Sequence, residues 1–230
     1  MKKIFIDQKY KWTETNSSDV EIALVGNLYI NESSFSGNRA NLALIDYLNL
    51  SGHLASEPLI EDIPEKLHAL KGDFAILIKT KKCIISIVDK KRSYPIFYTQ
   101  TSSGYSFSNN PVWLKESLSD LKVNNNALLA FKMAGYTIGN ETIYRNLFQL
   151  QAGECCIFDT KTKKLETIKY FRYLKNINSQ DIENDGIEQL HEATKLTFEK
   201  MIETLDGRPV FIPLSGGLDS RLILALLKEY

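Results

Sequence analysis

Two apolar runs joined by a pair of glycines restrict the fold of this 230-residue chain more than any other feature. The first run, Val210–Ile212, is short, β-branched and aromatic, as in strands that a parallel sheet buries on both faces. The second run, residues 222–227, reads Leu-Ile-Leu-Ala-Leu-Leu and consists mostly of strong helix formers. The pattern predicts a buried strand, a tight turn and a helix, which together open a parallel α/β domain.

The loop between these runs carries groups suited to a phosphate. Gly216 and Gly217 let the backbone come close to a ligand, and the start of the helix offers free N–H groups and the positive end of its dipole. Ser215 and Ser220 add hydroxyl donors. Asp219 is an acid at the position where an anion would bind, so its carboxylate would repel a phosphate. A divalent cation that bridges the carboxylate to the phosphates removes this repulsion. The residues therefore predict a phosphate site with Asp219 as a Mg²⁺ ligand.

The same residues allow a simpler interpretation. Glycines beside Asp and Ser also form ordinary turns and helix caps, so the loop need not bind anything. Two other motifs are excluded, because a Walker loop needs Gly-Lys-Ser/Thr and a hydrolase nucleophile elbow needs glycine where Pro213 stands. Ser215 is accordingly not expected to be a nucleophile, and we assign no catalytic residue.

Composition limits the classes of partner. With 43% apolar and 24% charged residues, the chain is an ordinary globular sequence of one or two domains. Its 28 basic residues balance 28 acidic ones, which argues against a nucleic acid or a membrane surface held by net charge but leaves a local patch open. The apolar run nearest the N-terminus, residues 4–6, is too short for a signal peptide, and no stretch reaches membrane-spanning length, so we expect a cytoplasmic protein.

Cys83, Cys155 and Cys156 lack metal-ligand spacing and are expected to be buried apolar groups.

The first two-thirds of the chain alternate between strand and helix patterns. The clearest hairpin is predicted over residues 72–89. Other strands are predicted at 4–6, 20–30, 96–98, 105–107, 155–158 and 165–169, with a break at Gly26 and Asn27. Helices are predicted over 38–50, from 60 or 64 to 70, over 111–118, and over 127–134 between the Asn124 cap region and Gly135. The pattern indicates an α+β domain with antiparallel pairing.

Residues 176–185 are polar and are the best candidate for a linker between domains. We therefore divide the chain into one domain over residues 1–175 and a second over residues 176–230. The second domain opens with an amphipathic helix pattern over 187–205. Helix, strand, loop and helix are the expected start of a parallel sheet domain.

The segment Leu214–Ser220, LSGGLDS, resembles the SGGxDS pyrophosphate loop of the N-type ATP pyrophosphatases and is most similar to their asparagine synthetase branch. Weaker matches to the glutaminase domain of that family occur upstream and in the family's order, at residues 26–29, 70–75, 89–98, 151–154 and 171–173. The resemblance implies an α+β domain like the Ntn hydrolases or class II glutamine amidotransferases. The beginning of an α/β ATP pyrophosphatase domain, similar to the adenine nucleotide α-hydrolases, would follow it.

Two positions depart from the family's pattern. Lys2 stands where glutamine-using members have the cysteine whose thiolate attacks the amide. Residues 37–41, Gly-Asn-Arg-Ala-Asn, stand where the family has Gly-Ser-Asp-Cys-Glu, whose Asp holds the glutamine amine. The departures imply a degenerate glutaminase domain that does not hydrolyse glutamine. Similar losses occur in the related β-lactam synthetases and lasso-peptide cyclases, where the substrate or a peptide supplies the amine.

The resemblance implies an ATP-dependent carbon–nitrogen ligase that adenylates a carboxylate and lets an amine attack the product. Ser215, Gly216, Gly217 and Ser220 would bind the pyrophosphate of ATP, and Asp219 would bind Mg²⁺. The carboxylate and amine substrates stay open, with a peptide or a natural-product intermediate among the possibilities. A non-catalytic binding or scaffold module is the alternative, so it also stays open whether the chain is an enzyme.

The last strand and helix carry a further expectation. Synthetase domains of this family continue with more strands and helices, so we expect a fragment, a truncated product or one half of a split enzyme. A symmetry mate in a homodimer or a partner chain would then complete the sheet. Without one, the ladder groups of the strand and the apolar side chains of the helix would stay uncovered.

Overall fold

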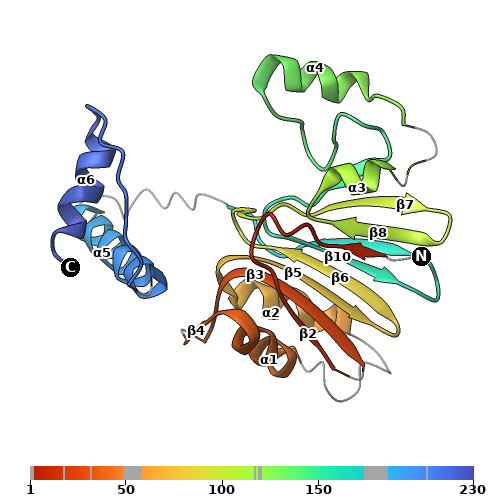
Figure 1. Cartoon of the computed structure of the whole chain (residues 1–230), viewed down its shortest axis with the longest axis horizontal. Helices are drawn as coiled ribbons and strands as arrows, with labels where there is room; N and C mark the ends of the chain where they lie inside the picture. Colours follow the sequence, from red (N-terminus) through yellow and green to blue (C-terminus); the bar gives the residue numbers. More distant parts are fainter. Residues whose placement is uncertain are drawn as a thin grey trace. The chain divides into compact units, whose positions relative to one another are not determined.

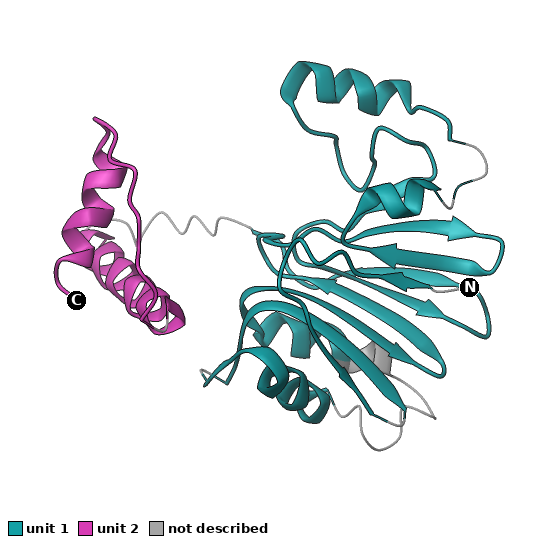
Figure 2. Ribbon diagram, in the orientation of Figure 1, with its two compact units in different colours: residues 1–173 teal, residues 174–230 magenta. Residues whose placement is uncertain are grey.

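The chain divides into two units, residues 1–173 and 174–230, which Figure 2 shows in different colours. The computed structural model describes residues 3–17, 19–31, 33–48, 59–116, 118, 121–173, 186–205 and 207–230, with the backbone alone at 59–62. The strands that it describes all lie in the first unit, and the described part of the second unit contains two helices.

The larger sheet of the first unit has seven strands in the order β11-β10-β6-β5-β3-β2, with β4 also paired to β3. The strands are β2 (Thr13–Asn16), β3 (Val20–Ile30), β4 (Ser33–Phe35), β5 (Lys71–Thr80), β6 (Cys83–Val88), β10 (Glu154–Asp159) and β11 (Leu165–Lys169). All their pairings are antiparallel. The longest pairing in the sheet joins β3 to β5 and runs from Val20 opposite Thr80 to Tyr29 opposite Lys71.

A second, four-stranded sheet has the order β1-β8-β7-β9. Its strands are β1 (Ile4–Phe5), β7 (Phe97–Thr101), β8 (Gly104–Ser108) and β9 (Leu147–Gln149). The pairing of β1 with β8 is parallel and the others are antiparallel, so the expected antiparallel pattern is confirmed apart from this one pair. The turn between β7 and β8 is shorter than predicted, because the two strands extend to Thr101 and from Gly104.

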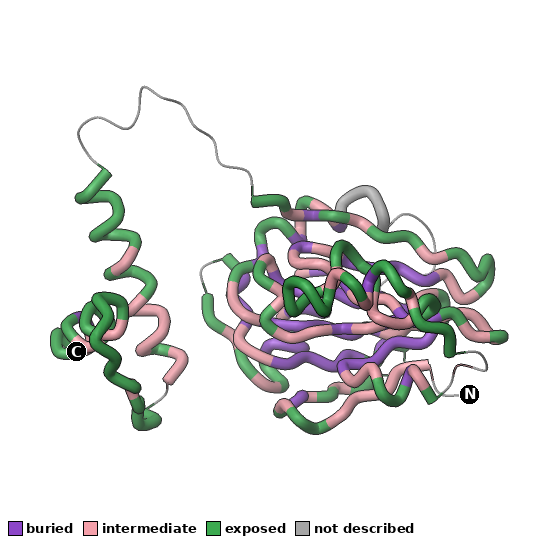
Figure 3. The backbone as a smooth tube through the Cα atoms, turned by 90° about the horizontal axis from the view of Figure 1, so that it is seen from above, coloured by how far each residue is buried: buried purple, intermediate pink, exposed green. Residues whose placement is uncertain are grey.

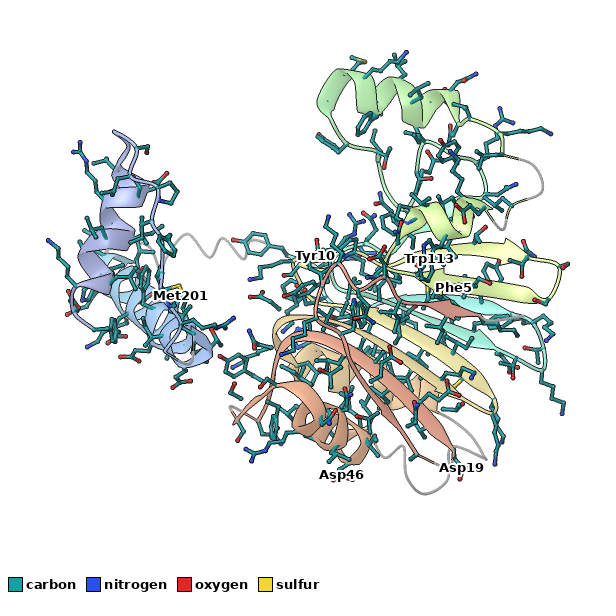
Figure 4. All side chains as sticks on the ribbon, in the orientation of Figure 1. Phe5, Tyr10, Asp19, Asp46, Trp113 and Met201 are labelled. Atoms are coloured by element: carbon teal, nitrogen blue, oxygen red, sulfur yellow. The ribbon has the colours of Figure 1, made fainter. Side chains whose placement is uncertain are left out.

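The described residues of the first unit form four helices: α1 (Gly37–Tyr47), α2 (Leu59–Ala69), α3 (Pro111–Glu116) and α4 (Asn125–Ala134). In Figure 1, α1 and α2 cover one face of the larger sheet, and α3 lies against β7 and β8. Phe5 of β1 meets Trp113 of α3 edge to face, with ring centroids 5.6 Å apart (Figure 4). α4 has the predicted ends, since the Asn124 side chain accepts a hydrogen bond from the Ala127 N–H and Gly135 is left-handed.

The larger sheet is buried on both faces because its strands alternate apolar side chains between two cores. In β5, Phe74, Ile76 and Ile78 pack with α1 and α2, whereas Ala75 and Leu77 pack toward the second sheet. Figure 3 shows the buried segments running through the sheets of the first unit. The fold is therefore an α+β structure with a helical layer, a seven-stranded sheet and a four-stranded sheet.

The expected break in β3 at Gly26 and Asn27 is wrong. β3 is continuous, and Gly26 lies opposite Phe74 in the middle of the β3–β5 pairing. Gly26 has a φ of +95°, and a Cβ atom there would lie 1.9 Å from the carbonyl oxygen of Asp73. Glycine is needed at this position because β5 approaches the backbone closely, not because the strand ends.

The second unit contains α5 (Gly186–Leu205) and α6 (Leu218–Leu227), both at predicted positions. The strand predicted at Val210–Ile212 does not form, and Phe211 is 90% exposed instead of buried. A strand needs neighbours for its backbone N–H and C=O groups, and the described residues of this unit supply none. The linker predicted at 176–185 lies outside the described residues. Of the helices described, none combines the length and apolar content that crossing a bilayer requires.

The close approach at Gly26 can be tested with a matched pair of alanine variants. Gly26→Ala should lower the free energy of unfolding of the first unit by about 3 kcal/mol or more, since it adds both a left-handed alanine and an overlap with backbone. Gly37 also has a positive φ, of 58°, but a Cβ there meets nothing within 4 Å. Gly37→Ala should therefore cost only about 1 kcal/mol. Urea unfolding measures both values, and equal losses would contradict the close approach.

Candidate functional site

The predicted phosphate loop lies at the start of α6. Gly217 is the N-cap residue of this helix, and Asp219 lies in its first turn. Ser215, Gly216, Gly217 and Asp219 are exposed, and Ser220 is half-buried. The N-terminal end of α6 is therefore open to a ligand from solvent.

Hydrogen bonds draw the two serines together across the glycines. The Ser215 and Ser220 hydroxyl oxygens are 3.2 Å apart, and the Ser215 N–H donates to Ser220 Oγ at 3.3 Å. The Gly217 N–H donates to Ser215 Oγ, also at 3.3 Å. These contacts place two hydroxyl groups beside the first turn of the helix, where its N–H groups and dipole favour an anion.

The two glycines are not required by the conformation of the loop. Gly217 has a φ of −76°, and neither glycine is among the residues with positive φ. A Cβ atom on Gly216 would meet nothing within 4 Å, and one on Gly217 would meet only Ser215 Oγ, at 3.3 Å. The space beside Gly216 is thus free of protein atoms, as close approach of a ligand to this backbone would need.

Asp219 is the acid that could hold a metal ion at this loop. Within the described residues, no cluster of three or more His, Cys, Asp or Glu side chains could hold a metal on its own. Mg²⁺ in nucleotide sites commonly takes one or two protein carboxylates and completes its shell with phosphate oxygens and water. A single exposed carboxylate in the predicted phosphate loop is compatible with that arrangement.

Among the residues at the expected glutamine pocket, Asn41 has a structural role in this chain. Lys2 lies outside the described residues. Arg39 is exposed on α1, so a cation stands where the resemblance expects the acid that holds an amine. Asn41 is fully buried, and its Nδ2 donates to the Thr13 carbonyl at 3.0 Å and to Thr15 Oγ1 at 2.9 Å. Asn41 therefore fastens α1 to β2 and is not available to a ligand.

The cysteines are poorly suited to nucleophilic chemistry. Burial raises the pKa of both Cys155 and Cys156 in β10 to about 12, so both thiols stay protonated at neutral pH. Cys83 is only partly buried, contrary to expectation, and burial raises its pKa as well. The predicted burial is confirmed for Cys155 and Cys156.

Asp89 is a structural residue for which the sequence predicts no role, although it lies in a segment that resembles the family. Its carboxylate is buried and accepts hydrogen bonds from the N–H groups of Phe74, Lys91 and Ser93 at 3.1, 2.7 and 2.9 Å. In the same turn Arg92 is left-handed, with a φ of 60°, and its Nη2 donates to Gln149 Oε1 at 2.6 Å. An acid directly after a buried strand was the available signal, and its role here is to close the turn after β6.

Comparison with known proteins agrees with the class expected for the first unit. Residues 59–171 match the glutamine amidotransferase domain family. A Methanocaldococcus jannaschii protein, whose name assigns it to the glutamine-hydrolysing asparagine synthetases, is 24% identical over 163 residues. That alignment covers 68% of this chain and 30% of the relative.

Two solved structures are similar at a lower level. One is a glutamine phosphoribosylpyrophosphate amidotransferase from B. subtilis, complexed with ADP and GMP, and the other is an allosteric regulatory enzyme of purine biosynthesis. Both are 17% identical, with TM-scores of 0.39 and 0.38, and the alignments cover 72% of this chain and 32% of each of theirs. The chain spans about a third of the length of the relatives that it matches. The match over residues 59–171 makes this part of the first unit similar to a glutamine amidotransferase domain, and the chain is also similar to part of a protein named as an asparagine synthetase.

Proposed function

We propose that this chain is part of an asparagine synthetase-like, ATP-dependent carbon–nitrogen ligase that does not hydrolyse glutamine. In this proposal the first unit is a degenerate Ntn-type glutaminase domain, and the second begins an ATP pyrophosphatase domain. A substrate carboxylate attacks the α-phosphorus of ATP and displaces pyrophosphate. An amine then attacks the acyl-adenylate, so that an amide forms and AMP leaves.

The open space at Gly216 is the observation that carries the nucleotide part of this proposal. Neither its own φ nor its neighbours require a glycine at position 216, and the open space leaves room for a phosphate group to rest against the backbone. The Ser215 and Ser220 hydroxyls and the start of α6 supply donors around that space. In the proposed reaction these groups bind the pyrophosphate portion of ATP. They also stabilise the negative charge that develops on pyrophosphate as it leaves.

Asp219 would hold Mg²⁺ against the same phosphates. The cation would neutralise part of the phosphate charge and so make pyrophosphate a better leaving group. The carboxylate would also be repelled by a phosphate in the absence of a cation, so nucleotide binding at this loop should depend on Mg²⁺.

The loss of glutamine hydrolysis is supported by the first unit. Cys155 and Cys156 are buried and protonated at neutral pH, which removes them as nucleophiles. Arg39 would repel the ammonium group of glutamine at the position where the resemblance expects an acid. The amine would then come from the acceptor substrate itself.

A non-catalytic binding module is the second candidate. It is favoured by the apolar side chains that the second unit exposes, among them Ile187 at 88%, Phe211 at 90% and Leu218 at 79%. Such residues are typical of surfaces that another protein covers. This candidate predicts no dependence on ATP or Mg²⁺.

The metal role can be tested by removing the carboxylate. Asp219→Ala in the full-length protein should abolish Mg²⁺-dependent exchange between ATP and labelled pyrophosphate, because the bridging cation loses its protein ligand. Glu229→Ala, which removes an exposed acid beyond the other end of α6, is the matched control and should leave exchange unchanged. Exchange at the wild-type level in Asp219→Ala would refute the metal role.

The close approach at Gly216 gives an independent test. Gly216→Ala should leave the thermal unfolding of the protein unchanged, since the added methyl meets no protein atom. The same methyl should weaken binding of Mg·ATP by about tenfold or more, because it fills the space that a phosphate would occupy. Titration calorimetry measures the affinity, and unaltered binding would show that the phosphates do not rest against this residue.

Glutamine provides the test of the first unit. The purified protein should release no glutamate from glutamine, whatever acceptor is present, and a glutamine analogue that alkylates catalytic thiols should label none of its cysteines. Glutamate release above that of a heat-denatured sample, together with such labelling, would mean that a working glutaminase site exists.

A further inference from the structure

The outer edge of β11 is the longest strand edge that the described residues leave open. β11 is the last strand of the larger sheet, and none of the described strands pairs with its far side. The other sheet edges are shorter or covered. A β-bridge between Glu141 and Phe148 covers β9, and β1 has only two residues. At β2, the Asn41 Nδ2 donates a hydrogen bond to the Thr13 carbonyl. β11 has five residues and contains neither proline nor glycine.

The hydrogen-bond pattern shows which backbone groups face outward. The Asp159 N–H donates to the Lys164 carbonyl at 3.0 Å, and the Tyr170 N–H donates to the Gly153 carbonyl at 2.9 Å. Bonded and non-bonded pairs alternate along an antiparallel ladder, so Glu166 and Ile168 direct their backbone groups to β10. Leu165, Thr167 and Lys169 consequently direct their N–H and C=O groups away from the sheet. These three residues can receive another strand.

Lysines gather at the beginning of this edge. Lys161, Lys163 and Lys164 are exposed in the turn before β11. The neighbouring hairpin adds Lys82, whose carbonyl accepts the Thr160 N–H at 2.7 Å. Burial, and to a smaller extent the positive charge of Lys163, lower the pKa of Lys3.

Few acids offset these lysines. Residues 159–169 contain four lysines against two acids, in a chain whose net charge is zero, and Lys169 is paired with Glu154 of β10 at 3.6 Å, which leaves the three lysines of the turn. One of those acids, Asp159, is engaged in the turn, where its carboxylate accepts the N–H groups of Lys161 and Thr162. The open edge therefore lies in a locally positive field.

We propose that β11 binds an extended acidic peptide segment of a partner protein as an added strand. The peptide backbone pairs with Leu165, Thr167 and Lys169, and its carboxylates lie near Lys161, Lys163 and Lys164. A second copy of this chain is a poor occupant, because it would offer its own locally positive edge and lacks the run of carboxylates that an acidic peptide supplies. A nucleic acid could meet the lysines but has no peptide groups to pair with the strand.

The experiment measures binding of a fluorescent peptide, acetyl-Glu-Val-Glu-Val-Glu-Val-amide, to the whole chain by fluorescence anisotropy. The peptide should bind, and its affinity should fall as salt rises. The same peptide with N-methyl groups on alternate residues keeps its charge but cannot pair as a strand, and it should bind about tenfold more weakly or not at all.

Two variants at one position separate the backbone from the side chain. Thr167→Pro removes an outward N–H at a site where an edge strand tolerates proline, and it should weaken binding by about tenfold or more. Thr167→Val keeps the N–H and should bind like the wild type. Circular dichroism establishes that both variants remain folded.

A charge reversal tests the lysines. The triple variant Lys161→Glu, Lys163→Glu and Lys164→Glu should lose the acidic peptide and bind the corresponding Lys-Val peptide instead. Equal binding of the N-methylated peptide, or unchanged binding by Thr167→Pro, would overturn strand addition. Displacement of the peptide by a single-stranded oligonucleotide at equal charge concentration would overturn the choice of a peptide partner.

Discussion

Burial of the seven-stranded sheet on both faces is the constraint on which the first unit depends. Neighbouring residues of β5 enter different cores, Ile76 beneath the helices and Leu77 against the second sheet. A shift of one residue in the pairing of β3 with β5 would exchange the two sets of side chains, so the register is fixed from both sides. The same pairing places Gly26 directly against the Asp73 carbonyl, so position 26 accepts only glycine as long as β3 and β5 pair in this register.

Local signals in the sequence were sufficient for much of this fold. The hairpin over residues 72–89 and the capped helix after Asn124 were predictable, because turn residues, apolar alternation and caps all lie within the segments themselves. The continuity of β3 was not predictable, since the left-handed glycine at 26 is explained only by its partner strand. The strand expected at Val210–Ile212 fails for a related reason: apolar composition permits a strand, but only neighbouring strands stabilise one. The polar strands β2 and β4 were missed because pairing, not composition, makes them strands.

The residues of the candidate nucleotide site were easier to predict from the sequence than the fold around them. LSGGLDS gave every residue of the loop, and the structure adds that Ser215 and Ser220 converge and that Gly216 faces open space. By contrast, the roles of Asn41 and Asp89 depend on partners distant in the chain, and the open edge of β11 follows from the strand order. The proposal thus combines a short-range motif for nucleotide binding with a domain in which the two thiols of β10, Cys155 and Cys156, are too deeply buried for glutamine chemistry.

The central claim is that the loop at the start of α6 binds the pyrophosphate part of a nucleotide. The most direct measurement is a titration of the isotopically labelled protein with pyrophosphate, with and without Mg²⁺, followed through backbone amide resonances, which detect even weak binding. The account predicts Mg²⁺-dependent shifts concentrated at Gly216, Gly217 and Ser220. Unmoved signals at these residues under saturating pyrophosphate and Mg²⁺, or shifts confined to other parts of the chain, would contradict it.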